Sequence, residues 1–85
     1  MYYVYIIQNQ DGKKYIGFST DLRKRLSSHN QGKNTSTKGS QWELIYYESY
    51  RSEQDARARE KSLKNSGGSR RHLYARIKNS LKCKI

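Results

Sequence analysis

The sequence predicts an α+β fold, in which a small three-stranded antiparallel sheet is flanked by about three helices in the order β-β-α-β-α-α. Two observations support this fold class. β-Branched and aromatic residues gather in three short runs, as they do in strands, and leucines recur at helical spacing after those runs. No proline-rich linker, repeat or low-complexity tract divides the 85 residues, so we expect one domain over residues 1–85.

The first two strands are expected at residues 2–8 and 14–18, joined by the turn "NQDGKK". The turn permits two registers. A two-residue loop would place Tyr5 and Tyr15 on opposite faces of the hairpin. A three-residue loop, with Gly12 in the left-handed conformation, would place the two tyrosines on the same face. Local turn chemistry leaves both registers open.

The first helix is expected over about residues 20–30, because two leucines and His29 recur at i, i+4 and i+7. Ser19 or Thr20 would cap its N-terminus, since a side-chain hydroxyl can accept a hydrogen bond from a free backbone N–H. Gly32 would end the helix, since glycine readily adopts the left-handed conformation of a helix stop.

A polar, basic loop is expected at residues 31–41, followed by the third strand at 42–50, an aromatic run without proline. The second helix is expected over about 53–65, with Ser52 as its N-cap. The glycine-containing "SGGS" should break the chain, and a third helix with a dense basic flank should follow over about 69–82.

The charge of the chain indicates its partner. Eighteen lysines and arginines face seven acids, which gives a formal net charge of +11. Compact proteins this basic most often bind polyanions, because each phosphate contact releases counterions. A membrane surface is the rival partner, but no apolar anchor, lipidation signal or signal peptide is present, so we expect no membrane association and a cytoplasmic protein. The one cysteine, Cys83, excludes an internal disulfide and the usual cysteine-rich zinc sites.

Three features break the pattern of the expected core. Arg25 and His29 lie one turn apart at the leucine edge of the first helix. Glu60 lies in the middle of the apolar stripe of the second helix. Tyr5 and Tyr15 place hydroxyl groups on strands whose other residues are predicted to be buried. A buried carboxylate costs several kcal/mol unless it is paired or bound to metal, so the inward acid requires a partner.

Each feature alone has a simpler structural explanation. Arg25 can lie along the protein surface, His29 can favour the negative end of a helix, and Glu60 can pair with Lys64 one turn later. Together, a carboxylate, a guanidinium, an imidazole and two phenols on a basic surface suit phosphodiester chemistry. In that chemistry the carboxylate would hold a hard divalent cation and the guanidinium would bind phosphate oxygens.

At these residues the sequence resembles the GIY-YIG nuclease family, specifically its small free-standing members, over about residues 2–80. The "GIY" element corresponds to "YVY", in which Tyr5 is kept, and the "YIG" element is intact from Tyr15. "TDLRKRLSSHN" resembles the first-helix signature, and "DARAREKSLK" resembles the second-helix segment. Two positions depart from the family pattern: Phe18 stands where some members have a basic residue, and the asparagine often found after the metal-binding glutamate has no clear counterpart.

The resemblance implies a metal-dependent cut of one DNA strand, with Mg²⁺ or Mn²⁺ at Glu60 and water as the nucleophile. It implies that Tyr5 is the general base, that Tyr15 forms a hydrogen bond nearby and that Arg25 binds the scissile phosphate. His29 would help position Tyr5 or the phosphate. Both tyrosines must then face the helices that carry the arginine and the glutamate. The resemblance therefore favours the three-residue hairpin loop.

The alternative function is a nucleic-acid-binding module of the same fold without useful cleavage. Glu60 favours the enzyme, because an inward acid would repel phosphate in a pure binder. A basic adaptor for another protein would leave the spacing of tyrosine, arginine and glutamate unexplained. Without an appended specificity domain, the chain would read DNA shape weakly, act as a homodimer or use a targeting partner protein. Six basic residues are candidates for DNA contacts: Lys33, Lys38, Arg70, Arg71, Arg76 and Lys78.

Overall fold

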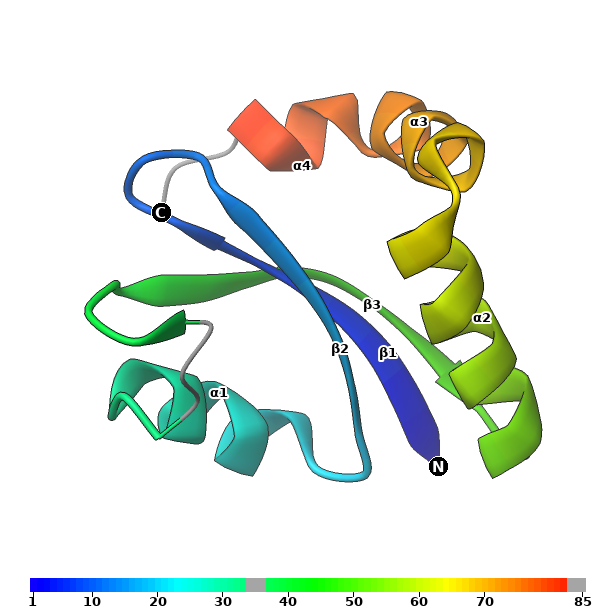
Figure 1. Cartoon of the computed structure of the whole chain (residues 1–85), viewed down its shortest axis with the longest axis horizontal. Coiled ribbons are helices and arrows are strands. Elements are labelled where there is room, and N and C mark those ends of the chain that lie inside the picture. Colours follow the sequence, from blue (N-terminus) through cyan, green and yellow to red (C-terminus); the bar gives the residue numbers. More distant parts are fainter. Residues whose placement is uncertain (34–36, 83–85) are drawn as a thin grey trace.

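The structure, a computed structural model, describes residues 1–33 and 37–82; Cys83 and the middle of the basic loop lie outside the described residues. Seven elements follow one another along the chain (Figure 1): β1 (Tyr2–Asn9), β2 (Lys14–Ser19), α1 (Leu22–Asn30), β3 (Trp42–Tyr50), α2 (Glu53–Asn65), α3 (Gly67–Arg76) and α4 (Lys78–Lys82). The predicted α+β fold with one three-stranded antiparallel sheet is confirmed. Within the described ranges, no helix is long and apolar enough to cross a membrane.

The hairpin has the three-residue loop. β1 is the central strand, with β2 and β3 as antiparallel neighbours, and Tyr5 stands opposite Gly17 in the β1–β2 pair. The loop closes where the backbone N–H of Asn9 donates to the carbonyl of Lys13 at 2.9 Å. Gly12 takes the left-handed conformation, with φ at 81°, which a residue with a side chain rarely adopts.

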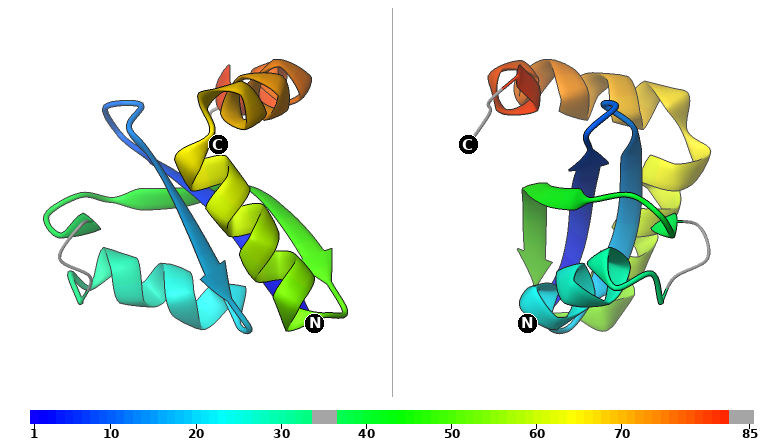
Figure 2. Two further views of the ribbon diagram at one scale, coloured as in Figure 1. Left: turned by 45° about the vertical axis from the view of Figure 1, so that its right-hand side comes forward. Right: turned by 90° about the vertical axis from the view of Figure 1, so that its left-hand side faces the viewer.

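The two faces of the sheet are covered by different helices (Figure 2): α1 packs on one face, and α2 and α3 pack on the other. β1 alternates between the two cores, because successive side chains of a strand point to opposite faces. Val4 and Ile6 join the core under α2 and α3, whereas Tyr5 and Ile7 join the core under α1. The central strand thus carries Tyr5 to the face where α1 lies.

β3 contributes to both cores because it contains a bulge. Its register shifts between the partners of Ile6 and Ile7, which pair with Tyr46 and Leu44 respectively. A bulge inserts one extra residue and so exchanges the faces to which the following side chains point. Leu44 therefore packs under α1, while Tyr46 packs against the core under α2.

The caps of α1 differ in part from the prediction. The N-cap is Asp21, whose carboxylate accepts a hydrogen bond from the Lys24 backbone N–H at 3.0 Å. The prediction that Ser19 or Thr20 caps the helix is therefore wrong. The Ser19 hydroxyl instead accepts a hydrogen bond from the Asp21 backbone N–H at 2.9 Å, which turns the chain into the helix. A carboxylate also interacts better than a hydroxyl with the positive end of the helix. Gly32 ends the helix as predicted, with φ at 73°.

The third helix was predicted to begin about two residues later than it does, and as one helix over about 69–82 where the structure has two. Ser66 caps α3 by accepting from the Ser69 backbone N–H at 3.2 Å, so both glycines of "SGGS" lie in the first turn of the helix rather than in a break. The chain leaves helical geometry at Ile77, where φ is −113°, and α4 follows. The predicted limits of α2 and its Ser52 cap are correct.

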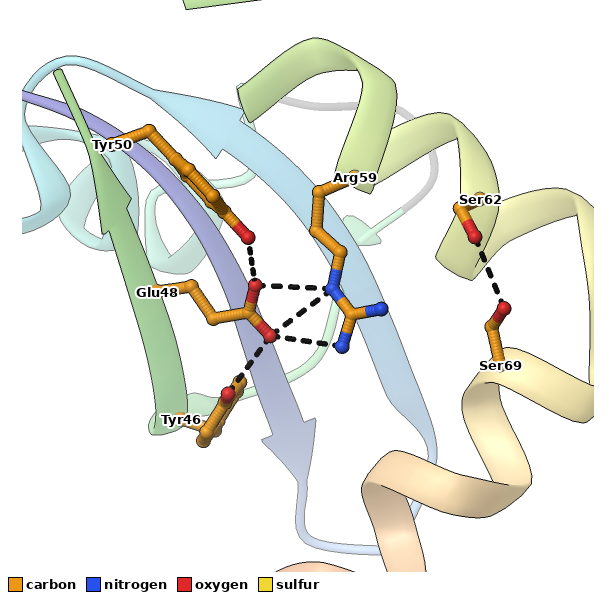
Figure 3. Close-up of polar contacts among 6 residues, drawn as sticks. All are labelled: Tyr46, Glu48, Tyr50, Arg59, Ser62 and Ser69. Carbon is orange, nitrogen blue, oxygen red and sulfur yellow. Dashed lines mark hydrogen bonds and ion pairs between the residues drawn. The ribbon is translucent and has the colours of Figure 1, made fainter. Parts of the chain in front are cut away.

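A polar cluster joins β3 to α2 (Figure 3). The carboxylate of Glu48 accepts from Arg59 Nε at 3.0 Å and from Arg59 Nη2 at 3.1 Å. It also accepts from the Tyr46 hydroxyl at 2.8 Å and from the Tyr50 hydroxyl. Burial, and then the hydrogen bond and charge of Glu48, raise the pKa of Tyr50 to about 12. The cluster therefore favours the neutral phenol of Tyr50 in the folded protein.

Tyr50→Phe should make the alkaline loss of stability smaller than in the wild type. Because folding raises the pKa of Tyr50 from 10 to about 12, its contribution is fully present below pH 10 and is lost as the pH rises toward 12. Urea denaturation between pH 9 and 12 measures this dependence. Tyr47→Phe is the matched control, because Tyr47 is 53% exposed. Equal alkaline losses in both variants would contradict the assignment.

Candidate active site

The site is centred on the hydroxyl of Tyr5. The Tyr5 side chain extends from β1 over the neighbouring strand β2. Tyr5 is buried, and its ring lies directly over Gly17 of β2. A Cβ atom placed on Gly17 would stand 2.3 Å from the Tyr5 hydroxyl oxygen and 2.4 Å from Cζ, closer than any real contact. The glycine of the "YIG" element is therefore required sterically, since only glycine lets the phenol pass over β2.

A chain of hydrogen bonds runs through this hydroxyl. Arg25 Nε donates to the Tyr5 hydroxyl at 3.3 Å, and the hydroxyl lies 2.8 Å from His29 Nε2. Since the guanidinium can only donate, we assign the phenol proton to the bond with His29. His29 is then protonated on Nδ1, which lies 2.7 Å from the Thr37 hydroxyl oxygen. Burial, and then the charge of Arg25, lower the pKa of His29, which favours this neutral imidazole.

The other side of the site comes from β2 and α2. The Tyr15 ring packs edge-on against His29, with 5.0 Å between ring centroids. Lys64 Nζ lies 5.5 Å from the Tyr15 centroid and 3.2 Å from Glu60 Oε2. The Glu60 side chain is 18% exposed, and its charge is one of the influences that raise the pKa of Tyr5. All five predicted site residues thus lie in one cluster: Tyr5, Tyr15, Arg25, His29 and Glu60.

The protonation of Tyr5 follows from two opposing influences. Burial raises the pKa of the phenol, while the hydrogen bond and charge of Arg25 lower it, and burial is the larger influence. The cation that a tyrosine base needs is therefore present, but in this state the phenol stays protonated at neutral pH. His29 Nε2, which is hydrogen-bonded to the phenol, is an acceptor for that proton.

One carboxylate is available for a metal ion. Among residues 1–33 and 37–82, no three His, Cys, Asp or Glu side chains gather into a complete metal site. Mg²⁺ is usually held by about one or two carboxylates together with water and substrate phosphates. Glu60 fits that mode, because its partly exposed carboxylate stands among cationic side chains that attract phosphate. The ion pair with Lys64 that sequence analysis offered as the simpler explanation is present as well.

The residues that hold His29 in place were not predicted from the sequence. The Trp42 indole donates to the Thr37 carbonyl at 2.9 Å, and the Asn30 side chain bonds both the N–H and the C=O of Trp42, at 2.6 and 3.1 Å. These bonds fix the buried Thr37 beside the imidazole. The run "NTSTKGS" contains several equivalent hydroxyl groups, so the sequence does not indicate that Thr37 is buried beside His29.

The six predicted DNA-contact residues do not share one environment. Arg70 is partly buried, and its Nη1 donates to the carbonyls of Leu63 and Lys64, at 2.8 Å each, which closes the C-terminal end of α2. The structure thus gives Arg70 a role in helix capping that the sequence did not indicate. The other five are exposed: Lys33, Lys38, Arg71, Arg76 and Lys78.

Comparison with known proteins places these residues in a family context. The family model for the GIY-YIG catalytic domain matches residues 1–79. A UPF0213 protein of Streptococcus pneumoniae is 38% identical over 64 residues, which is 73% of this chain and 65% of that relative. A UPF0213 protein of Bacillus pumilus is 32% identical over 75 residues, covering 86% of this chain and 76% of the relative. The chain thus spans just under two thirds of the pneumococcal relative. No solved structure matches the chain.

Proposed function

This chain belongs to the GIY-YIG nuclease family, and from that premise we propose that it is a divalent-metal-dependent endonuclease that hydrolyses one strand of DNA per active site. Residues 1–85 would act as one nuclease domain. The observation that carries the proposal is the hydrogen bonding of Arg25 and His29 to the Tyr5 hydroxyl, close to the carboxylate of Glu60. A basic surface supplies the affinity for the phosphate backbone.

Arg25 and Glu60 would bind the scissile phosphate from two sides. The Arg25 guanidinium donates to Tyr5 through Nε. Its terminal nitrogens carry four further N–H donors, which can bind phosphate oxygens. Glu60 would hold Mg²⁺ or Mn²⁺, which when bound supplies positive charge to the phosphate oxygens. Both interactions strengthen as negative charge develops during attack.

Tyr5 and His29 would move the proton of the attacking water. As the water oxygen forms its bond to phosphorus, one water proton passes to the Tyr5 oxygen while the phenol proton passes to His29 Nε2. One P–O ester bond breaks, and the leaving oxygen takes a proton from solvent. The raised pKa of Tyr5 and the lowered pKa of His29 suit this relay, because the phenol starts protonated and the imidazole starts neutral. Tyr15 would orient the water or the imidazole.

One observation favours the alternative of a binding module. Lys64 neutralises Glu60 at 3.2 Å, so the acid has a partner even without a metal ion. A nucleic-acid-binding module of this fold could therefore tolerate Glu60. The two functions differ in whether purified protein cuts DNA when a divalent ion is supplied.

The proposed function is tested by nicking of supercoiled plasmid with Mg²⁺ or Mn²⁺. The wild type should nick the plasmid and EDTA should stop it, while Arg25→Ala should be about 10²-fold slower, the usual effect of losing one charge-stabilising donor. Arg23→Ala is the matched control, because it removes an exposed arginine of the same helix and should leave the rate unchanged. DNA binding without cleavage of plasmid, branched or single-stranded DNA would support the binding module instead.

A further inference from the structure

Two cations of α2 stand over aromatic rings of β2. The Arg57 guanidinium lies 4.1 Å from the centroid of the Phe18 ring. Lys64 Nζ lies 5.5 Å from the centroid of the Tyr15 ring. Phe18 is near the end of β2 and Tyr15 is near its start, so α2 runs alongside this strand in the opposite direction. β2 is an edge strand of the sheet. Phe18 packs with the core under α2 and Tyr15 with the core under α1, so the two cations meet this edge strand at its two faces.

Glu60 lies between these two cations. Arg57, Glu60 and Lys64 follow one another at i, i+3 and i+7, which places them on one stripe of the helix. A third cation extends the line at the hairpin end of β2, where Lys14 Nζ lies 5.4 Å from the centroid of Tyr74. The proposed metal-binding carboxylate is therefore flanked by positive charge on both sides along the strand edge.

The α2 cations are available to a ligand. The Arg57 and Glu53 side chains, joined by a 2.8 Å ion pair, are 57% and 51% exposed, and the Lys64 side chain is 43% exposed. Exposed ion pairs of this kind contribute little to stability, so a phosphate can replace the acid as the partner. The aromatic rings hold the cations near the strand edge without neutralising their charge.

We propose that Lys14, Arg57 and Lys64 form a phosphate-binding track along the outer edge of β2, which holds the backbone of the cut DNA strand on both sides of Glu60. The proposal rests on the proposed nuclease function. Arg57 and Lys64 are seven residues apart, which is about 10 Å of helix. Measured along the duplex axis, where the phosphates of one strand rise by about 3.4 Å each, that length corresponds to about three phosphates. The ligand is the phosphodiester backbone, so binding at this β2-edge track is independent of base sequence.

The track is tested by the salt dependence of binding to a fluorescent DNA duplex in EDTA, where no cleavage occurs. The slope of log K against log salt is negative, and for each lost phosphate contact its magnitude should fall by about 0.9. Arg57→Gln and Lys64→Gln should each show this fall, and the double variant should show about twice it. Lys61→Gln is the matched control, because it removes an exposed lysine of the same helix. Equal slopes in all variants, or an equal fall for Lys61→Gln, would overturn the proposal.

Two further measurements keep the result specific. Arg57→Lys keeps the charge and should keep the wild-type slope; a fall equal to that of Arg57→Gln would overturn the assignment of a phosphate contact. Plasmid nicking measured in parallel separates this proposal from the proposed function. Nicking by the wild type with unchanged slopes in the track variants would remove the track alone. The expected fall in slope without nicking would support the track and reject the nuclease.

Discussion

Glu60→Gln is expected to slow metal-dependent nicking by about 10³-fold while leaving the fold intact. Glutamine has nearly the same size as glutamate, but its neutral amide is a poor ligand for a hard divalent ion. Losing several kcal/mol of charge stabilisation at the phosphate, at about 1.36 kcal/mol per factor of ten, accounts for that magnitude. The position is partly exposed on α2, so the substitution disturbs no core packing.

The measurement is nicking at saturating protein, together with Mn²⁺ binding to the protein alone by calorimetry. Glu53→Gln is the matched control, because it breaks an equivalent i, i+4 ion pair with Arg57 on the same helix. That variant should keep both Mn²⁺ binding and nicking. Equal activity in the two variants would remove Glu60 from the metal site, whereas loss of nicking with unchanged Mn²⁺ binding would show that the ion binds elsewhere.

The double environment of Glu60 explains why the sequence supported two explanations of it. The side chain pairs with Lys64 as an ordinary helix residue would, and it also lies close enough to the phenol to influence the pKa of Tyr5. A helix packed on a sheet face beside an edge strand allows both, since a residue on the side nearest that strand lies close to the site while its i+4 neighbour stays beside it.

Most of the fold was predictable because its signals are local. The Ser52 cap of α2, the stop of α1 at Gly32 and the aromatic run of β3 each depend on a few neighbouring residues. The hairpin register was not local: turn chemistry allowed two loops, and the family resemblance selected the one in which both site tyrosines share a face. The start of α3 was missed because the Ser66 cap outweighs the low helix propensity of the two glycines.

The surroundings of the site could not be predicted from the sequence. Thr37 is buried beside His29 only because Trp42 and Asn30 fix the end of the loop. The capping role of Arg70 depends on where α3 crosses the end of α2. Likewise, the cations over the rings of β2 require that α2 run along that strand, which no local pattern encodes. These features arise from tertiary packing, so sequence periodicity contains no trace of them.

Gly17→Ala is expected to destabilise the protein by about 1–3 kcal/mol, the usual cost of overpacking, and to abolish nicking. The new Cβ would lie within 3 Å of three Tyr5 atoms, Oη, Cζ and Cε1. The phenol cannot yield without leaving Arg25 and His29, because both bond its hydroxyl. Either the site loses these hydrogen bonds or the strands β1 and β2 separate, and catalysis is lost in both cases.

A double-mutant cycle in urea distinguishes this steric coupling from a general effect of alanine in the strand. Tyr5→Leu removes the three clashing atoms, so Gly17→Ala should be neutral or slightly stabilising in that background, since alanine is better than glycine inside a strand by about 0.5–1 kcal/mol. Gly67→Ala is the control, because its nearest heavy atom is 3.7 Å away and the added methyl group meets no obstacle. If Gly17→Ala destabilised both backgrounds equally, the glycine would serve the backbone rather than the phenol. The predicted coupling instead means that the "YIG" glycine is required by the path of the Tyr5 side chain across β2, and so by the candidate active site that this side chain builds.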